Sequence, residues 1–226
     1  MNELNLNTAR TSRATDSAAS VNKVVRNTYT LLSMTLFFSA LCAVAAMAMQ
    51  LGQGTGLLLI IGGFVMSFVV RATAESSKGL IAVFVFAGFM GGGLGPMLSA
   101  YLMAYANGSA IIAQALGGTG LIFLSLSGYA LTTGRNFNFL GGFLATGMMV
   151  MLVAMIANIF LQIPAMSLAI SAAVIMLMSG FILYDTSRII NGGERNYIMA
   201  TISLYLSIFN LFIHLLNLIA ALTGRE

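Results

Sequence analysis

The sequence predicts an all-α integral membrane protein that crosses the bilayer seven times. Of its 226 residues, 59% are hydrophobic and only 7% are charged, whereas a soluble domain is about 25% charged. Seven long apolar segments are separated by short gaps, and each is long enough to cross a hydrocarbon core of about 30 Å as a helix. These segments lie near residues 28–50, 55–70, 80–103, 110–133, 138–161, 165–187 and 198–222.

The positively charged residues predict how the chain is oriented in the membrane. Nine of the ten Lys and Arg residues fall in the N-terminal segment or in every second gap between apolar segments. The nine are Arg10, Arg13, Lys23, Arg26, Arg71, Lys78, Arg135, Arg188 and Arg195, and only Arg225 falls on the other side. Because basic residues near membrane spans are retained in the cytoplasm, we expect a cytoplasmic N-terminus and a C-terminus on the opposite side.

The seven spans occupy nearly the whole chain, so function is expected in the bundle, its short loops or the N-terminal segment. Residues 1–27 are rich in Asn, Ser, Thr and Ala and contain no apolar run. We expect them to form a flexible cytoplasmic tail, disordered up to about Asn22, that is not removed as a signal peptide. Residues 28–222 form the transmembrane domain and residues 223–226 a short C-terminal tail. The net charge of +4 indicates attraction to the lipid bilayer rather than to nucleic acid.

Glycine-rich stretches inside the spans predict close helix packing, because helices in lipid associate through small residues that let their backbones approach. The third span contains two pairs at GxxxG spacing, Gly88 with Gly92 and Gly91 with Gly95. Since Pro96 removes a backbone donor, we also expect a kink or local unwinding from Gly93 through Gly95 to Pro96. We interpret further sets in the fourth and fifth spans in the same way: Gly117, Gly118, Gly120 and Gly128, then Gly141, Gly142 and Gly147.

The last span carries a polar face along its whole length. Five polar residues recur there at spacings of 4, 3, 4 and 3, which places them on one side of a helix: Ser203, Ser207, Asn210, His214 and Asn217. Lipid would leave their hydrogen-bonding groups unsatisfied, so we expect this face to point into the bundle. Two interpretations stay open. The face either holds the helix in place by hydrogen bonds, which the sequence favours, or lines a hydrated pathway.

Asp185 is the one acidic residue inside a predicted span, late in the sixth and near the cytoplasmic boundary. Arg188 follows on the same helical face and is its expected ion-pair partner, with Arg71 as a second candidate. An ion pair that closes the helix end and a proton-sensitive gate both fit this arrangement. We expect no catalysis and no cofactor, because one intramembrane acid, one histidine (His214) and one cysteine (Cys42) provide neither an enzyme's paired groups nor a metal site.

Several longer segments carry a resemblance to a known family. They are VVRNTYTLLSMTLFFSA, LGPMLSAYL, ALGGTGLIFLSLSGYALTTGR, NFNFLGGFL, ANIFLQIPAMSLAIS and NGGERNYIMATISLYLSIFNLF. Over about residues 25–222 the chain resembles the Bax inhibitor/YccA family, most of all its bacterial inner-membrane members. The resemblance implies a seventh helix at the centre of two three-helix layers, an inner-membrane location and a periplasmic C-terminus. It also implies a partner, the membrane-anchored protease FtsH with its associated regulators, which such proteins engage through the cytoplasmic tail as substrate and modulator.

Other members of the family imply an alternative function, a pH-sensitive calcium leak gated near Asp185. In them an acid late in the sixth helix and an acid in the seventh share hydrogen bonds, with a basic residue of the second helix nearby. Asp185 in ILYDT matches the first acid, and Arg71 matches the basic residue. The acid of the LYLD pattern falls at Ser207, in LYLS. A serine cannot share a proton with Asp185 as a second carboxyl does, so this departure favours protease modulation over the calcium leak. Ser207 can still form a hydrogen bond, and we expect it to bond Asp185.

Overall fold

The computed structural model describes residues 2–224, with side chains from Ser20 onward. This part of the chain folds into seven helices: α1 (Asn2–Ala48), α2 (Gln53–Thr73), α3 (Lys78–Ala104), α4 (Gly108–Thr133), α5 (Leu140–Leu161), α6 (Pro164–Ile190) and α7 (Tyr197–Thr223). Each helix contains a segment long and apolar enough to cross a membrane. The predicted fold class, an all-α protein with seven spans, is confirmed.

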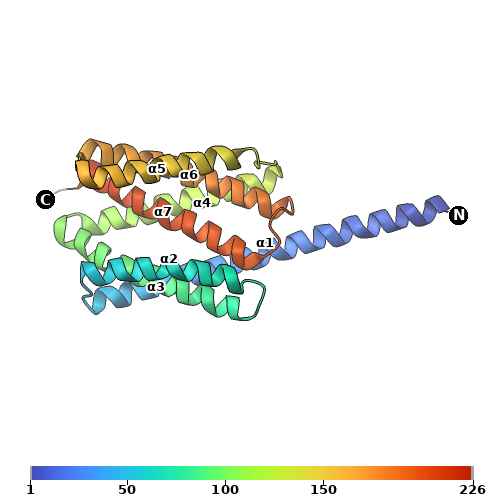
Figure 1. The fold of residues 1–226 in the computed structure, drawn as a ribbon, viewed down its shortest axis with the longest axis horizontal. Helices are drawn as coiled ribbons and strands as arrows, with labels where there is room; N and C mark the ends of the chain where they lie inside the picture. The colour runs from blue at the N-terminus through green and yellow to red at the C-terminus, as the bar shows by residue number, and fades with distance from the viewer. Residues whose placement is uncertain (1, 225–226) are drawn as a thin grey trace.

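Helix α7 lies at the centre of the bundle, between two layers (Figure 1). On one side α1 and α2 both pack against α3, and on the other side α4 and α5 both pack against α6. Helix α7 contacts α1, α2, α3, α4 and α6, and the side chains of Leu204, Leu211 and Leu216 along its length are fully buried. The expected central position of the seventh helix is therefore confirmed.

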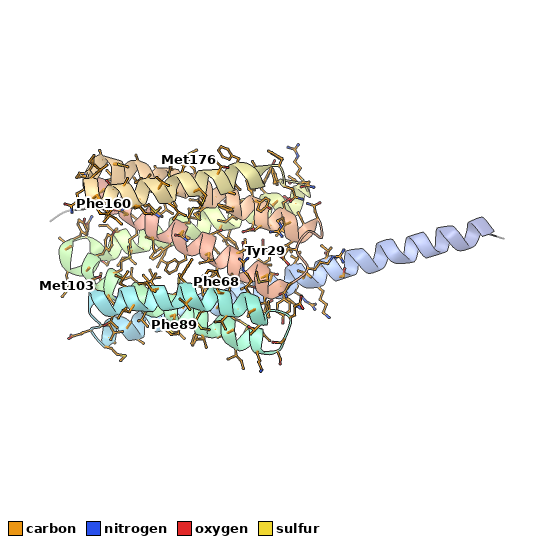
Figure 2. All side chains as sticks on the ribbon, in the orientation of Figure 1. Tyr29, Phe68, Phe89, Met103, Phe160 and Met176 are labelled. Carbon is orange, nitrogen blue, oxygen red and sulfur yellow. The ribbon has the colours of Figure 1, made fainter. Side chains whose placement is uncertain are left out.

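The outer surface of the bundle is covered by apolar side chains. Large hydrophobic residues point away from the protein on every layer, and Figure 2 labels Phe68 on α2, Met103 on α3, Phe160 on α5 and Met176 on α6 among them. In water such a surface would drive aggregation, but in lipid the exposure of apolar side chains carries no free-energy penalty. The distribution of exposed residues therefore agrees with a protein embedded in a bilayer.

Glycines of α3 let both of its neighbours approach closely. A Cβ atom at Gly91 would collide with the carbonyl oxygen of Ser39 on α1, and one at Gly93 would lie 3.0 Å from the carbonyl oxygen of Gly56 on α2. The other members of the predicted pairs also face neighbouring helices, Gly88 against Phe38, Gly92 against Leu59 and Gly95 against Ala43. Helix α3 continues through Pro96, so the expected local unwinding is not found, and the kink stays a prediction.

The glycines of α4 do not make such contacts. A Cβ atom at three of them would have nothing within 4 Å, namely Gly117, Gly120 and Gly128. At Gly118 it would meet only Leu215, at 3.5 Å. The prediction that these glycines pack a neighbouring helix is wrong for Gly117, Gly120 and Gly128, because spacing does not show whether a helix lies against them, whereas Gly118 does face α7. In α5, Gly141 and Gly147 do face α6, whereas Gly142 faces open space.

The segment predicted as a flexible tail is helical. Helix α1 begins at Asn2, and its first part extends beyond the bundle before the membrane-spanning segment Ser20–Ala48 (Figure 1). Residues 2–22 contain neither glycine nor proline, so nothing in the backbone stops the helix from continuing out of the span. The expected irregular chain is therefore replaced by helix, while the mobility of this segment and its cytoplasmic location stay predictions.

Candidate functional site: the polar face of the central helix

The central helix is fixed at its start by Asn196. The Asn196 Oδ1 atom accepts hydrogen bonds from the backbone N–H groups of Ile198 and Met199, at 2.9 and 3.2 Å, and so caps the helix. Its Nδ2 atom donates to the carbonyl oxygen of Ala74, just after α2, at 2.9 Å. One side chain therefore both starts α7 and ties it to α2, which sets where the polar face of α7 meets its neighbours.

Asp185 of α6 faces the first turns of α7. Its side chain is buried, with 6% of the residue exposed, and Ser203 Oγ donates a hydrogen bond to its Oδ2 atom at 2.7 Å. Both residues line a cavity of about 240 Å³ together with Arg71 of α2, Arg188 and Glu194. The structure thus brings Asp185, Arg71 and Arg188 to one place, as the sequence suggested, and adds Ser203 and Glu194 to them.

Arg188 pairs with a different acid from the one expected. Its guanidinium lies 3.6 Å from a carboxylate oxygen of Glu194 and also 5.6 Å from the centre of the Tyr184 ring. Within the described residues the salt bridge of Arg188 is therefore made with Glu194, which the loop between α6 and α7 carries back to the arginine, while Asp185 lies in the same cavity. Both side chains of the pair are partly exposed, so it contributes at most about 1 kcal/mol to stability.

The hydrogen bond to Asp185 also comes from one turn earlier on α7 than expected. Ser203 makes it, whereas Ser207 is buried beside a second cavity of about 410 Å³, lined also by Asn210, Met90 of α3 and Met178 of α6. The expectation that Ser207 bonds Asp185 is wrong among the contacts of the described chain. The alignment fixes a position on α7, but the rotation and shift of α7 against α6 decide which hydroxyl reaches the carboxylate.

The far half of the polar face is held by hydrogen bonds to α6. His214 Nδ1 lies 3.2 Å from Ser171 Oγ, and Asn217 Nδ2 donates to the same oxygen at 3.1 Å. Asn210 Nδ2 instead donates to the carbonyl oxygen of Leu206 on its own helix, at 2.9 Å. These direct bonds between side chains support the interpretation of this half as a structural seam between α6 and α7.

Other hydroxyl groups link the helices outside the predicted face. Tyr205 Oη and Ser39 Oγ are 2.6 Å apart and join α7 to α1. Thr186 of α6 lies within hydrogen-bond distance of Tyr29 on α1, at 3.2 Å, and of Ser127 on α4, at 3.4 Å. Sequence reasoning missed these contacts because a single hydroxyl in an apolar segment has no periodic signal.

The chemistry that this site offers is hydrogen bonding and charge. Asp185 and Glu194 are the acids that line the small cavity. Within the described residues, three or more His, Cys, Asp or Glu side chains do not come close enough together to hold a metal ion. The hydrogen bond from Ser203 to Asp185 and the ion pair between Arg188 and Glu194 make this a place where charges are paired near one end of the bundle.

Comparisons with known proteins match nearly the whole chain. The family model described as inhibitor of apoptosis-promoting Bax1 matches residues 21–224. The modulator of FtsH protease YccA of Escherichia coli K12 is 49% identical over 203 residues, which cover 90% of this chain and 92% of that protein. A membrane protein of Vibrio cholerae is 47% identical over 206 residues, which cover 91% of this chain and 92% of the relative.

A relative in another Escherichia coli strain, 49% identical over 203 residues, is named inner membrane protein YccA. It too covers 90% of this chain, and 92% of its own length is matched. The names of these relatives describe a membrane protein that modulates a protease, not an enzyme. Together with seven membrane-spanning helices, they show that this chain is a multi-pass inner-membrane protein that belongs to the Bax inhibitor family.

Proposed function

We propose that this protein binds an FtsH-type membrane protease, is degraded by it, and thereby modulates its action on other membrane substrates, without chemistry of its own. The observation that carries the proposal is the 49% identity to the E. coli modulator of FtsH protease across 90% of the chain. An identity of that extent covers most of the membrane domain. It supports a shared partner more strongly than a shared fold alone would.

The N-terminal part of α1 offers the protease a segment to engage. It extends beyond the bundle (Figure 1), whereas α2 to α7 follow one another through short loops. Proteases attack chain ends that few contacts hold in place, and a membrane protease that pulls on its substrate needs such an end. On the predicted orientation this end lies in the cytoplasm.

The way α1 is held in the bundle suggests how a substrate also acts as a modulator. Pulling on the N-terminus would break the Ser39–Tyr205 bond, the Tyr29–Thr186 bond and the bond from Thr201 Oγ1 to the carbonyl oxygen of Thr28 at 3.3 Å. Interhelical hydrogen bonds contribute about 0.6–1.7 kcal/mol each in membrane proteins. A substrate that is extracted slowly occupies the protease for longer and so competes with its other substrates.

Deletion of residues 2–22 tests this proposal. Without the projecting segment, the half-life of the protein should rise to the value measured in cells that lack FtsH, and its overproduction should no longer slow the degradation of other FtsH substrates. Removal of residues 225–226, at the opposite terminus, is the control and should change neither. Pulse–chase labelling measures both quantities, and membrane fractionation checks that each variant is inserted. A deletion variant degraded as fast as the wild type would refute the proposal.

A passive cation leak gated near Asp185 is a second candidate, which the cavities along α7 favour. The cavity that holds Asp185 and Arg71 and the cavity beside Ser207 share two lining residues, Ser203 and Leu206. Adjacent cavities with polar groups along one helix provide part of a hydrated pathway from the end of the bundle towards its centre. Charged residues inside membranes commonly mark such pathways.

Calcium flux into liposomes tests the leak. Purified protein in calcium-free liposomes should admit Ca²⁺, and Asp185→Asn should change the flux or its dependence on pH. Glu75→Gln makes the same chemical change at an exposed acid between α2 and α3 and should leave the flux unaltered. Flux equal to that of empty liposomes at every pH would remove this candidate without affecting the proposed role towards the protease.

A further inference from the structure

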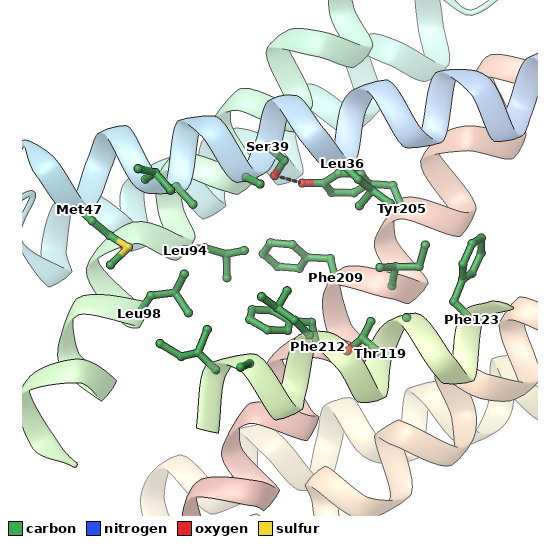
Figure 3. Close-up of a pocket in the computed structure, with 18 of the residues that line it drawn as sticks. Leu36, Ser39, Met47, Leu94, Leu98, Thr119, Phe123, Tyr205, Phe209 and Phe212 are labelled. Carbon is green, nitrogen blue, oxygen red and sulfur yellow. Dashed lines mark hydrogen bonds between the residues drawn. The ribbon is translucent and has the colours of Figure 1, made fainter. Parts of the chain in front are cut away.

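A large apolar crevice separates α1 from α4 (Figure 3). Its volume is about 590 Å³, and α1, α3 and α4 supply its walls while Tyr205, Phe209 and Phe212 of α7 form its floor. Val44 on α1 and Leu116 on α4 line it and are 63% and 57% exposed, so the crevice reaches the outer surface of the bundle. That surface faces lipid, so the crevice opens sideways into the bilayer.

The polar groups deep in the crevice are already paired within the protein, and Ser109 is an exposed lining residue. Ser39 and Tyr205 bond each other at 2.6 Å, as Figure 3 shows, and Thr119 Oγ1 donates to the carbonyl oxygen of Ala115 at 2.7 Å. The rest of the deep wall is formed by aliphatic and aromatic side chains, among them Leu94 and Phe209. Such a wall favours an occupant that carries no hydrogen-bonding groups, which is hydrocarbon.

The volume of the crevice selects the kind of hydrocarbon. A transmembrane helix about 10 Å wide and about 30 Å long occupies roughly 2,400 Å³, about four times the space available. The observed 590 Å³ is instead within the range of about 300–1,000 Å³ typical of pockets for single small ligands. A flexible lipid chain is thin enough to enter and is present at high concentration at the mouth.

We propose that this crevice binds one acyl chain of a membrane phospholipid. In the part of the chain that the structure describes, the backbones of α1 and α4 stay apart, and the two helices meet through the rings of Tyr29 and Phe123, whose centres are 6.0 Å apart. The bound chain would fill the gap beside this ring contact and couple the two layers. The crevice lies in the half of the bundle that contains Met47 and Leu102, near the ends of α1 and α3. On the predicted orientation the chain therefore comes from the periplasmic leaflet. This inference does not depend on the proposed function.

Tryptophan fluorescence tests the proposal directly, because the natural sequence contains no Trp. A single Trp is introduced into the full-length protein, which is reconstituted in phosphatidylcholine vesicles with or without bromine atoms on the acyl chains. Phe209→Trp places the probe on the crevice floor, where the native residue is only 7% exposed. Brominated chains should quench it nearly as strongly as Phe37→Trp, at an outward-facing position of α1 that is 68% exposed. Phe86→Trp, in the core at 0% exposed and outside the crevice, should stay unquenched.

Two glycines of α4 provide matched blocking variants. Both have nothing within 4 Å of an added Cβ, but Gly120 lines the crevice and Gly117 does not. In the Phe209→Trp background, Gly120→Leu should fill the crevice and abolish most of the quenching, whereas Gly117→Leu should leave it unchanged. Phe123→Trp, in the wall of the same crevice, gives the same readout if Phe209→Trp does not fold.

The remaining outcomes would overturn the proposal. If both crevice probes stay as bright as Phe86→Trp in brominated vesicles, side chains close the crevice and no lipid enters. If quenching is strong in dilute vesicles and disappears as the protein-to-lipid ratio rises, a second copy of the protein covers the crevice instead of lipid. Equal quenching after Gly120→Leu and Gly117→Leu would place the lipid outside the crevice.

Discussion

Replacement of Gly91 by alanine should separate α1 from α3 and destabilise the protein by more than about 3 kcal/mol. A Cβ atom at this position would overlap with the carbonyl oxygen of Ser39. That oxygen belongs to the backbone, so it cannot rotate away as the end of a long side chain can. Helix α1 would have to move as a unit, and the bond between Ser39 and Tyr205 would be lengthened with it.

Gly117→Ala on α4 is the matched control for this prediction. Its added methyl group would have nothing within 4 Å, and alanine is favoured over glycine in a helix by about 1 kcal/mol. We therefore expect Gly117→Ala to be neutral or slightly stabilising, whereas the identical change at Gly91 should be strongly destabilising. The stability of each variant is measured as the midpoint of its unfolding in mixed detergent micelles with increasing dodecyl sulfate. Equal midpoints for the two variants would contradict the packing described for α3.

The spans and the inward orientation of the polar face of α7 could be predicted because lipid leaves a helix few choices, whereas the central place of α7 was implied by the family resemblance. A spanning segment must satisfy its own backbone, so apolar length alone locates helices such as α5, predicted at 138–161 and found at Leu140–Leu161. A span that carries polar groups on one face must turn that face towards protein. In α7, Ser203, His214 and Asn217 do bond α6.

The partners of individual side chains could not be predicted in the same way. Spacing places Asp185 and Arg188 on one face of α6, but it does not show that the following loop returns Glu194 to the arginine. Ser203 and Ser207 lie on the same face of α7, and only the shift of α7 along α6 decides which of them reaches Asp185. Such shifts depend on packing summed over the whole bundle.

The contacts of individual glycines could not be predicted from their spacing either. Gly91 and Gly117 both stand in glycine-rich spans, yet one touches a neighbouring backbone and the other faces open space. Gly120 of α4 likewise has no neighbour within 4 Å of an added Cβ, and it lines the crevice. The crevice is lined by four helices, α1, α3, α4 and α7, of which the first and last lie at opposite ends of the chain, so no local pattern could indicate it.

Ser203→Ala should be the most damaging of the conservative changes in the polar face, at a cost of about 2–3 kcal/mol. Asp185 is buried, and among the described residues Ser203 is the hydrogen-bond donor within reach of its carboxylate. A hydrogen bond to a charged group contributes about 1.5–3 kcal/mol, and a buried acceptor left without a donor bears the full cost of its desolvation. Ser207→Ala makes the same change one turn later and should cost less than about 1 kcal/mol, because Ser207 lines a cavity and does not bond Asp185.

A double-mutant cycle separates the contact from the general effect of each change. Asp185→Asn removes the charge but keeps an oxygen that accepts from Ser203, so Ser203→Ala should cost only about 1 kcal/mol in that background. The difference of about 1–2 kcal/mol measures the coupling between the two residues, and Ser207→Ala should show none with Asp185→Asn. If the effects of Ser203→Ala and Asp185→Asn added within about 0.5 kcal/mol while those of Ser207→Ala did not, Ser207 would be the partner of Asp185. The position that stands at the family's second acid would then be the functional one, and α7 would sit one turn along from where the structure places it.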